Sequence, residues 1–267
     1  MTTNRIGVFG ANGRMGLALS EAATIKEQTQ LTGAYVRSSS SLLGINVNQV
    51  NSAADSAVSF SVESEVNNVD VLIDFTLPQG MRNHLKTAVA QKLPMVIGTT
   101  GLNADDMALL NDAAKHIPIV FARNYSVGVN VLLNLVQTAA TKFGDDLDIE
   151  IFEAHHRHKI DAPSGTALAI GESIADAKGW NHDEVAVYDR SQVETAKSQN
   201  EIGYSVLRGG DIVGEHTAYF ATMGERLELT HKASSRMTFA LGAVRAACWL
   251  QNKPAGLYDM QDVLDLK

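Results

Sequence analysis

Short apolar runs alternate with segments of helical spacing through the first half of the chain. Five predicted buried strands cover residues 5–9, 31–36, 69–75, 95–97 and 117–121. Helical spacing separates the later strands, over residues 81–91 and 104–116. Strands joined by helices of that length form right-handed crossovers. The pattern therefore predicts an α/β fold with a Rossmann-like, doubly wound parallel sheet.

The pattern changes after a long predicted helix over residues 126–143. Four further strands are predicted over residues 147–154, 203–207, 212–220 and 226–231, with little helix between the last three. This spacing favours a second, α+β domain with a mixed or antiparallel sheet. Helical spacing returns over residues 237–250. We expect one domain from residues 1–126 with 237–267, and a second from residues 127–236.

Composition limits the partners and the compartment. The 267 residues can bury a substantial core, and a net charge of -8 argues against a nucleic-acid surface. We expect no membrane association, since no apolar run approaches the length of a membrane span and no apolar signal segment precedes the first strand. Cys248 is the only cysteine, so we expect a reducing, cytoplasmic location.

Three glycines follow the first predicted strand. Gly10, Gly13 and Gly16 have the spacing GxxGxxG, which departs from the usual dinucleotide spacing GxGxxG. The physical roles survive the change: a tight turn, a close approach of backbone N–H groups to a pyrophosphate, and close helix packing. The alternative is a tight turn that binds nothing. Its place in the first strand–helix unit favours a nucleotide.

The end of the second strand bears on the choice of nucleotide. An NAD site usually carries an acid there for the ribose hydroxyls, whereas this chain has Val36 and Arg37, followed by four serines. An arginine with hydroxyls suits a 2′-phosphate, so we expect NADPH to be preferred. A solvated strand-end arginine is the alternative. Residues 98–101 and 122–125 also follow parallel strands, where ligands bind in such sheets, although a helix entry and a linker would explain them too.

The densest chemistry lies in residues 153–167, directly after the alternating apolar stretch 147–152. The segment reads Glu-Ala-His-His-Arg-His-Lys-Ile-Asp-Ala-Pro-Ser-Gly-Thr-Ala. Histidine titrates near neutrality, Lys159 can donate a proton or hold a carboxylate, and the Ser-Gly-Thr turn is typical of a helix start, which attracts anions. We predict a site for a small carboxylate beside proton donors.

Two other interpretations of this segment stay open. Surface loops often collect basic residues, so a solvated turn is the ordinary explanation. A metal site is the other alternative. In a regular strand, however, His156 and His158 would lie on one face and Glu153 with His155 on the other. With one cysteine, the chain also has no Cys/His zinc spacing, and we expect no metal.

Taken in order, several motifs resemble one enzyme family over nearly the whole chain. They are the glycine turn, Asp74-Phe75-Thr76, Gly98-Thr99-Thr100-Gly101, residues 124–130, residues 153–167 and Gly214-Glu215-His216. The chain resembles the 4-hydroxy-tetrahydrodipicolinate reductases, also called dihydrodipicolinate reductases, of bacterial diaminopimelate and lysine biosynthesis. The long segment from His155 onward is the most specific of these motifs.

The resemblance implies an activity and a division of roles. The activity is NAD(P)H-dependent reduction of a cyclic dicarboxylate, made by loss of water from 4-hydroxy-tetrahydrodipicolinate, with hydride delivered to ring carbon 4. His155 would donate or accept a proton and Lys159 would be a second proton donor. The substrate-binding residues would be His156, Gly165 and Thr166. The first domain would bind the dinucleotide, and the second would bind substrate and build a homotetramer through its sheet.

The resemblance also carries over the nucleotide contacts. These would be Gly10, Ala11, Asn12, Gly13, Arg14, Met15, Arg37, Gly98, Thr99, Thr100, Ala122, Arg123, Asn124 and Tyr125. Relatives often have an acid where this chain has Val36, and this departure also favours NADPH over NADH.

Two other classes of protein are weighed against this one. A different reductase of small amino-acid precursors would share the glycine turn but lack the segment from His155 to Thr166. A non-enzymatic regulator that senses nucleotides would keep the glycine turn and have no need of the proton donors. The presence of both motifs favours the reductase.

Overall fold

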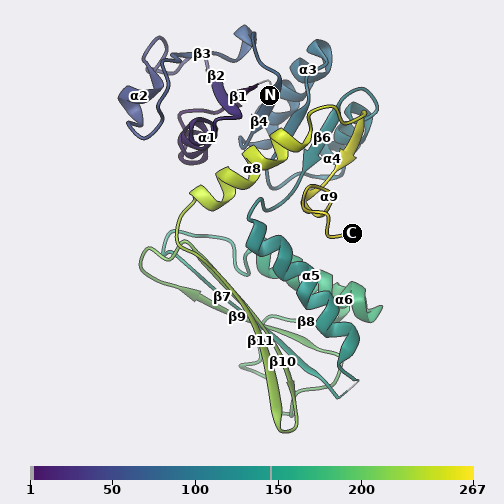
Figure 1. Cartoon of the computed structure of the whole chain (residues 1–267). Helices are drawn as coiled ribbons and strands as arrows, with labels where there is room; N and C mark the ends of the chain where they lie inside the picture. Colours follow the sequence, from purple (N-terminus) through teal and green to yellow (C-terminus); the bar gives the residue numbers. More distant parts are fainter. Residues whose placement is uncertain (1–2, 145) are drawn as a thin grey trace. The chain divides into compact units, whose positions relative to one another are not determined.

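The computed structural model describes residues 3–144 and 146–267 and separates into two compact units (Figure 1). The first unit runs to Val127 and resumes at Arg236–Lys267, and the second is Gly128–Ser235. Each unit has its own sheet and its own hydrophobic core. No helix in the described part of the chain is both long enough and apolar enough to cross a membrane.

The first unit contains a parallel sheet of seven strands. The strands are β1 (Asn4–Phe9), β2 (Thr29–Val36), β3 (Phe60–Val62), β4 (Val71–Asp74), β5 (Met95–Ile97), β6 (Pro118–Phe121) and β12 (Gly256–Tyr258). Their order is β12-β6-β5-β4-β1-β2-β3, so the direction of winding reverses between β1 and β4. Ligands bind beyond the carboxyl ends of the strands at such a reversal. The loops after β1 and β4 lie there.

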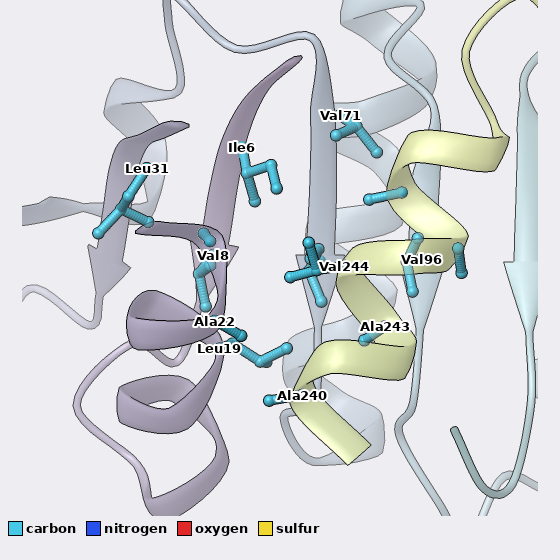
Figure 2. Close-up of a cluster of buried hydrophobic side chains, with 14 of the residues drawn as sticks. Ile6, Val8, Leu19, Ala22, Leu31, Val71, Val96, Ala240, Ala243 and Val244 are labelled. Atoms are coloured by element: carbon cyan, nitrogen blue, oxygen red, sulfur yellow. The ribbon is translucent and has the colours of Figure 1, made fainter. Parts of the chain in front are cut away.

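Helices cover both faces of this sheet. They are α1 (Arg14–Ile25), α2 (Val47–Val50), the 3₁₀ turn η1 (Glu63–Glu65), α3 (Pro78–Gln91), α4 (Ala104–Ala113), α8 (Met237–Trp249) and α9 (Met260–Leu264). On one face, α1 and α8 pack on Ile6, Val8 and Val96, as Figure 2 shows. On the other face, α3 and α4 pack on Leu72 and Ile97. Successive strand residues serve opposite faces, and both are buried, which explains the unbroken apolar runs.

The second unit places two helices on one face of a mixed sheet. Its elements are α5 (Val127–Lys142), β7 (Asp148–His155), α6 (Gly165–Lys178), α7 (His182–Val185), β8 (Ala186–Val187), β9 (Ile202–Arg208), β10 (Gly214–Thr222) and β11 (Glu225–Ala233). The strand order is β11-β10-β7-β9-β8. Strand β7 runs parallel to β9 and antiparallel to β10. Ile149 and Phe220 bury their side chains with Val136 of α5 and Ile170 of α6.

The fold class predicted from the sequence is confirmed, down to the parallel first sheet and the mixed second one. The prediction omitted β3 and β12, which lie at the two edges of the first sheet and have three residues each. Edge strands of that length leave little periodicity in the sequence. The helix start predicted at the Ser-Gly-Thr turn is also confirmed: α6 begins at Gly165, with Ser164 as its N-cap.

One close approach holds helix α8 against the segment that follows β6. A Cβ atom added to Gly242 would lie 1.8 Å from the carbonyl oxygen of Tyr125. We therefore expect Gly242→Ala to destabilise the first unit by about 1–3 kcal/mol, although alanine favours a helix more than glycine does. Denaturant unfolding measures this difference. Arg245→Ala, at an exposed position of α8, is the control, and equal stability of the two variants would contradict the close approach.

Candidate active site

The site of the second unit is built around a buried carboxylate on β7. Glu153 is fully buried, and its Oε2 lies 2.6 Å from Nδ1 of His155, two residues further along the same strand. His155 itself is only 9% exposed. When Nδ1 donates its proton to the carboxylate, Nε2 becomes the nitrogen that can exchange a proton. A Cβ atom on Gly214 would lie 3.0 Å from this Nε2, so the glycine leaves room beside it.

Arg208, the last residue of β9, completes the environment of the carboxylate. Its two terminal nitrogens donate to the two oxygens of Glu153, each at 2.7 Å. The same guanidinium donates to the backbone oxygen of Asp161 at 2.6 Å, which ties the loop after β7 to the sheet. A bidentate pair of this kind fixes orientation as well as charge. Arg208 therefore holds both the carboxylate and the loop that carries Lys159.

These contacts set the charge state of Glu153. Burial alone would raise the pKa of its carboxyl, but hydrogen bonds from His155 and Arg208 outweigh burial and lower the pKa to about 2. The Ser164 N–H adds a further hydrogen bond at 2.9 Å. The group is thus a permanent acceptor at neutral pH, which keeps the proton of His155 on Nδ1.

Ser164 links this carboxylate to the start of α6 and to a second histidine. Its Oγ accepts a hydrogen bond from the N–H of Ala167 at 3.2 Å and lies 2.9 Å from Nε2 of His216. Burial, together with the charge of the nearby His155, lowers the pKa of His216 to about 3. His216 is therefore neutral at physiological pH. Its Nε2 can accept a hydrogen bond from the hydroxyl of Ser164. This bond holds the Ser164 side chain in place as the N-cap of α6.

Lys159 lies on the loop between β7 and α6. Its side chain is 21% exposed and its ammonium is 2.9 Å from the exposed carboxylate of Asp161. The lysine charge also contributes to the lowered pKa of His216, after burial and His155, so it lies close to the buried network. An exposed ion pair of this kind is weak and can be exchanged for a ligand carboxylate.

The remaining predicted substrate residues surround the same loop. His156 is partly exposed, and its ring centroid is 6.2 Å from that of His158. Gly165 and Thr166 form the first turn of α6, where backbone N–H groups point out of the helix. Nothing lies within 4 Å of a Cβ atom built on Gly165, so its backbone can be approached closely. The site can therefore hold a carboxylate beside two proton-transfer groups.

A metal was not expected here. Within residues 3–144 and 146–267, no group of three or more His, Cys, Asp or Glu side chains is arranged to hold a metal ion.

The glycine turn of the first unit has a geometry that suits a dinucleotide. Gly10 has a φ of +62°, and a Cβ atom on Gly16 would lie 2.1 Å from the carbonyl oxygen of Gly10. Helix α1 has Gly13 as its N-cap, with no hydrogen bond from a side chain to its first N–H groups. Ala11 is buried, whereas Asn12 and Arg14 are exposed and Met15 is half-buried. A phosphate fits such a turn because backbone N–H groups can surround it.

At the end of β2, two side chains that are adjacent in the sequence have different environments. Val36 is fully buried in the core, whereas Arg37 is exposed. Ser40 N donates to Arg37 O at 2.9 Å, which turns the serine segment back behind the arginine. Among the described residues, the Arg37 guanidinium makes no ion pair or hydrogen bond. It is thus the first side chain after β2 that can meet a ligand.

The other two predicted nucleotide segments are placed at the same edge of the sheet. Gly98, Thr99 and Thr100 follow β5, with Thr99 buried and Thr100 exposed. Ala122 and Arg123 follow β6, with Ala122 half-buried and Arg123 exposed.

Tyr125, also predicted as a nucleotide contact, has a mainly internal position. It is 1% exposed, and its hydroxyl lies 2.9 Å from the carbonyl oxygens of both Ile97 and Val120. Next to it, Asn124 Oδ1 accepts a hydrogen bond from Ser126 N at 2.8 Å. The tyrosine side chain therefore ties the ends of β5 and β6 together.

Three residues of the candidate site in the second unit had no predicted role. Arg208 lies 55 positions from Glu153 in the sequence, and only the parallel register of β7 with β9 brings it beside His155. His216 pairs with Glu153 across the antiparallel β7 and β10. Glu153 itself stood within the predicted segment without a role. A basic residue at a strand end, before Gly209 and Gly210, was the only local signal for Arg208.

Comparisons with known proteins agree along the whole chain. Family models described as the N-terminus and the C-terminus of dihydrodipicolinate reductase match residues 4–125 and 128–264. A 4-hydroxy-tetrahydrodipicolinate reductase of Pseudoalteromonas translucida is 84% identical over 267 residues, which is 100% of each chain. One of Pseudomonas fluorescens is 57% identical over 98% of this chain and 99% of the relative.

Solved structures show the same fold. Dipicolinate-bound dihydrodipicolinate reductase from Paenisporosarcina sp. TG-14 has a TM-score of 0.74 at 22% identity, covering 98% of this chain and 99% of the other. GenD2 from gentamicin A biosynthesis, in complex with NAD, has a TM-score of 0.62 at 10% identity, covering 100% and 91%. Both family models and both close relatives lead to one conclusion: the chain belongs to the dihydrodipicolinate reductase family.

Proposed function

We propose that the two units divide the work of a nicotinamide-dependent reductase: the first binds the dinucleotide and the second holds the dicarboxylate. The chain is an oxidoreductase that reduces 4-hydroxy-tetrahydrodipicolinate, by way of dihydrodipicolinate, to tetrahydrodipicolinate in diaminopimelate and lysine biosynthesis. The observation that supports the division most directly is the buried Glu153–His155 pair beside Lys159 and the first turn of α6.

The residues of the second unit have complementary tasks in this proposal. A nicotinamide cofactor, when bound, supplies the hydride. The Lys159 ammonium and the first turn of α6, with Gly165 and Thr166, hold the substrate carboxylates, and His156 lies beside them. His155 exchanges a proton through Nε2, because its Nδ1 is held by Glu153. Lys159 is the second group that can supply a proton to the ring.

The nucleotide site of the proposal follows the edge of the first sheet. Residues 10–15 would surround the pyrophosphate, while residues 98–100 and 122–125 line the neighbouring strand ends. Because Arg37 is exposed and Val36 is buried, we propose that NADPH binds more tightly than NADH and that NADH is also used.

We also propose a cytoplasmic homotetramer that forms through the second sheet. Helices α5 and α6 cover one face of this sheet within the unit. The opposite face carries Phe152 and Tyr219, both half-buried, and Leu207, which is 41% exposed. An apolar face of this kind is typical of an interface between copies.

The role of Lys159 can be tested by removing its charge. We expect Lys159→Met to lower kcat/KM by about a hundredfold or more, because a charge-assisted contact to the substrate is lost. The dissociation constant of NADPH should stay unchanged. Arg157→Met, at an exposed position of the same loop, is the control. Steady-state rates with freshly generated substrate measure the effect, and near-normal turnover of the lysine variant would exclude the role.

Glu153 should affect both catalysis and acid stability. Glu153→Gln removes the acceptor that holds His155, so we expect kcat to fall by roughly ten- to a hundredfold. Since the folded-state pKa of about 2 is lower than the ordinary value of 4.5, the carboxylate stabilises the native state above about pH 4.5. That contribution disappears as the pH falls towards 2.

Denaturant unfolding at several pH values measures the same variant. At pH 7, Glu153→Gln should be clearly less stable than the wild type, and the gap should narrow between pH 4.5 and 2. A gap that is independent of pH over this range would show that ionisation of Glu153 does not stabilise the unit. Glu194→Gln, at an exposed position of the same unit, is the control.

The choice of cofactor depends on Arg37 in this proposal. A hydrogen bond to a charged group contributes about 1.5–3 kcal/mol, so NADPH should bind on the order of tenfold more tightly than NADH. Arg37→Ala should remove most of this preference. Lys26→Ala, at an exposed position just after α1, should leave it intact. Fluorescence titration gives the dissociation constants of NADPH and NADH for each variant. If the ratio of the two constants is the same in wild type and Arg37→Ala, Arg37 does not contact the 2′-phosphate.

A further inference from the structure

A second buried carboxylate lies in the first unit, at the point where the sheet reverses. Asp74 is the last residue of β4 and is fully buried. Its Oδ1 accepts hydrogen bonds from the N–H and the Oγ1 of Thr76, both at 2.7 Å, and from Oγ1 of Thr99 at 3.2 Å. Its Oδ2 lies 2.6 Å from Nδ1 of His84. One carboxylate thus joins the loops after β4 and β5.

The same loops press on the glycine turn. A Cβ atom on Gly10 would lie 2.7 Å from the methyl carbon of Thr76, so Thr76 packs directly against the first glycine. A Cβ atom on Gly98 would lie 2.3 Å from the ring of Phe75. The loop after β4 therefore touches the turn after β1 and the loop after β5. These are the segments that should surround a nucleotide.

His84 of α3 contacts the Asp74 carboxylate on the side away from Thr76 and Thr99, through Oδ2. It is 3% exposed, and its ring stacks on that of Phe9 with centroids 3.8 Å apart and planes 3° apart. Two carboxylates face it: Asp74 at Nδ1, and Glu63 of η1 at 3.4 Å from Nε2. Burial lowers the pKa of His84, but the bond to Asp74 and the charge of Glu63 raise it above its usual value overall.

This arrangement differs from that of a histidine that only fills the core. Among the described residues, the other hydrogen bonds to the Asp74 carboxylate come from Thr76 and Thr99, which lie at the carboxyl edge of the sheet where the nucleotide is proposed to bind. If His84 were lost, the buried carboxylate would lose its nearest donor, and a buried polar group that loses a partner relaxes or attracts water. Thr76 and Thr99 would then lose their fixed anchor.

We propose that Asp74 and His84 are a positioning pair for the nicotinamide nucleotide: His84 orients the carboxylate, and the carboxylate fixes Thr76 and Thr99 around the glycine turn. The pair acts through these residues and touches no reacting atom. The proposal rests on the proposed function, since it requires the first unit to bind a nicotinamide nucleotide.

The test compares two variants of His84 in the full-length protein. His84→Leu removes the donor, and we expect the dissociation constant of NADPH, measured by fluorescence titration without substrate, to rise on the order of tenfold. His84→Asn places an amide N–H where Nδ1 stood and should restore the affinity to within about threefold. The KM for the dicarboxylate should stay unchanged in both. His116→Leu, at an exposed position of the same unit, is the control.

A second pair of variants keeps the test decisive if His84→Leu does not fold. Thr76→Val keeps the methyl group against Gly10 and loses the hydroxyl bound to Asp74, whereas Thr76→Ser keeps the hydroxyl. We expect the valine variant to bind NADPH several-fold more weakly than the serine variant.

The outcomes distinguish a failure of the positioning pair from a failure of the proposed nucleotide-dependent function. A wild-type protein that binds neither NADPH nor NADH overturns the proposed function. A wild-type protein that binds, together with a folded His84→Leu variant of equal NADPH affinity, overturns the positioning pair. Equal affinity of Thr76→Val and Thr76→Ser overturns it too. A His84→Asn variant as weak as His84→Leu also overturns it, because the role then does not depend on the donor to Asp74.

Discussion

The candidate site of the second unit depends on the burial of one charge. Glu153 has no access to solvent, and a carboxylate in that position is tolerated only when donors satisfy it. The donors come from three elements: His155 on β7, Arg208 on β9 and the backbone of Ser164 before α6. Because the charge must be satisfied, it fixes the strand ends and the helix start together. His155 and the first turn of α6 therefore have a defined geometry in the absence of a ligand.

The two units use the same physical device for different purposes. In each, a carboxylate near the carboxyl end of a strand is buried and lies 2.6 Å from Nδ1 of a histidine. In the second unit, His155 lies next to the loop that carries Lys159, and the Glu153 carboxylate lies behind the histidine. In the first unit the order is reversed, since the histidine lies behind and the carboxylate bonds to the loop residues Thr76 and Thr99. In the proposed function, one pair orients a proton-transfer group, and the other orients the residues at the nucleotide edge of the first sheet.

At three positions, glycine allows a close approach that a side chain would prevent. Gly16 lets α1 approach the turn after β1, Gly242 lets α8 approach the segment that follows β6, and Gly214 leaves space beside Nε2 of His155. In the first two, the obstacle to a side chain is backbone, which cannot move aside as a flexible side chain can. These positions connect local backbone freedom to the placement of the two sites.

The fold class and the activity of the family could be predicted from the sequence alone. Periodicity showed the strands and helices because both faces of the first sheet and one face of the second are buried. The glycine turn and the segment from His155 to Thr166 were readable because their function depends on residues close together in the chain.

The contacts between residues that are distant in the chain became evident only from the three-dimensional arrangement. Arg208 and His216 reach Glu153 through strand register, Val36 is internal while Arg37 is exposed, and His84 meets Asp74 through the packing of α3 on the sheet. Composition and spacing contain no information on register or on which face of a helix meets a given strand end. Such contacts are set by the burial of the whole core, and for that reason they could not be predicted from any local segment.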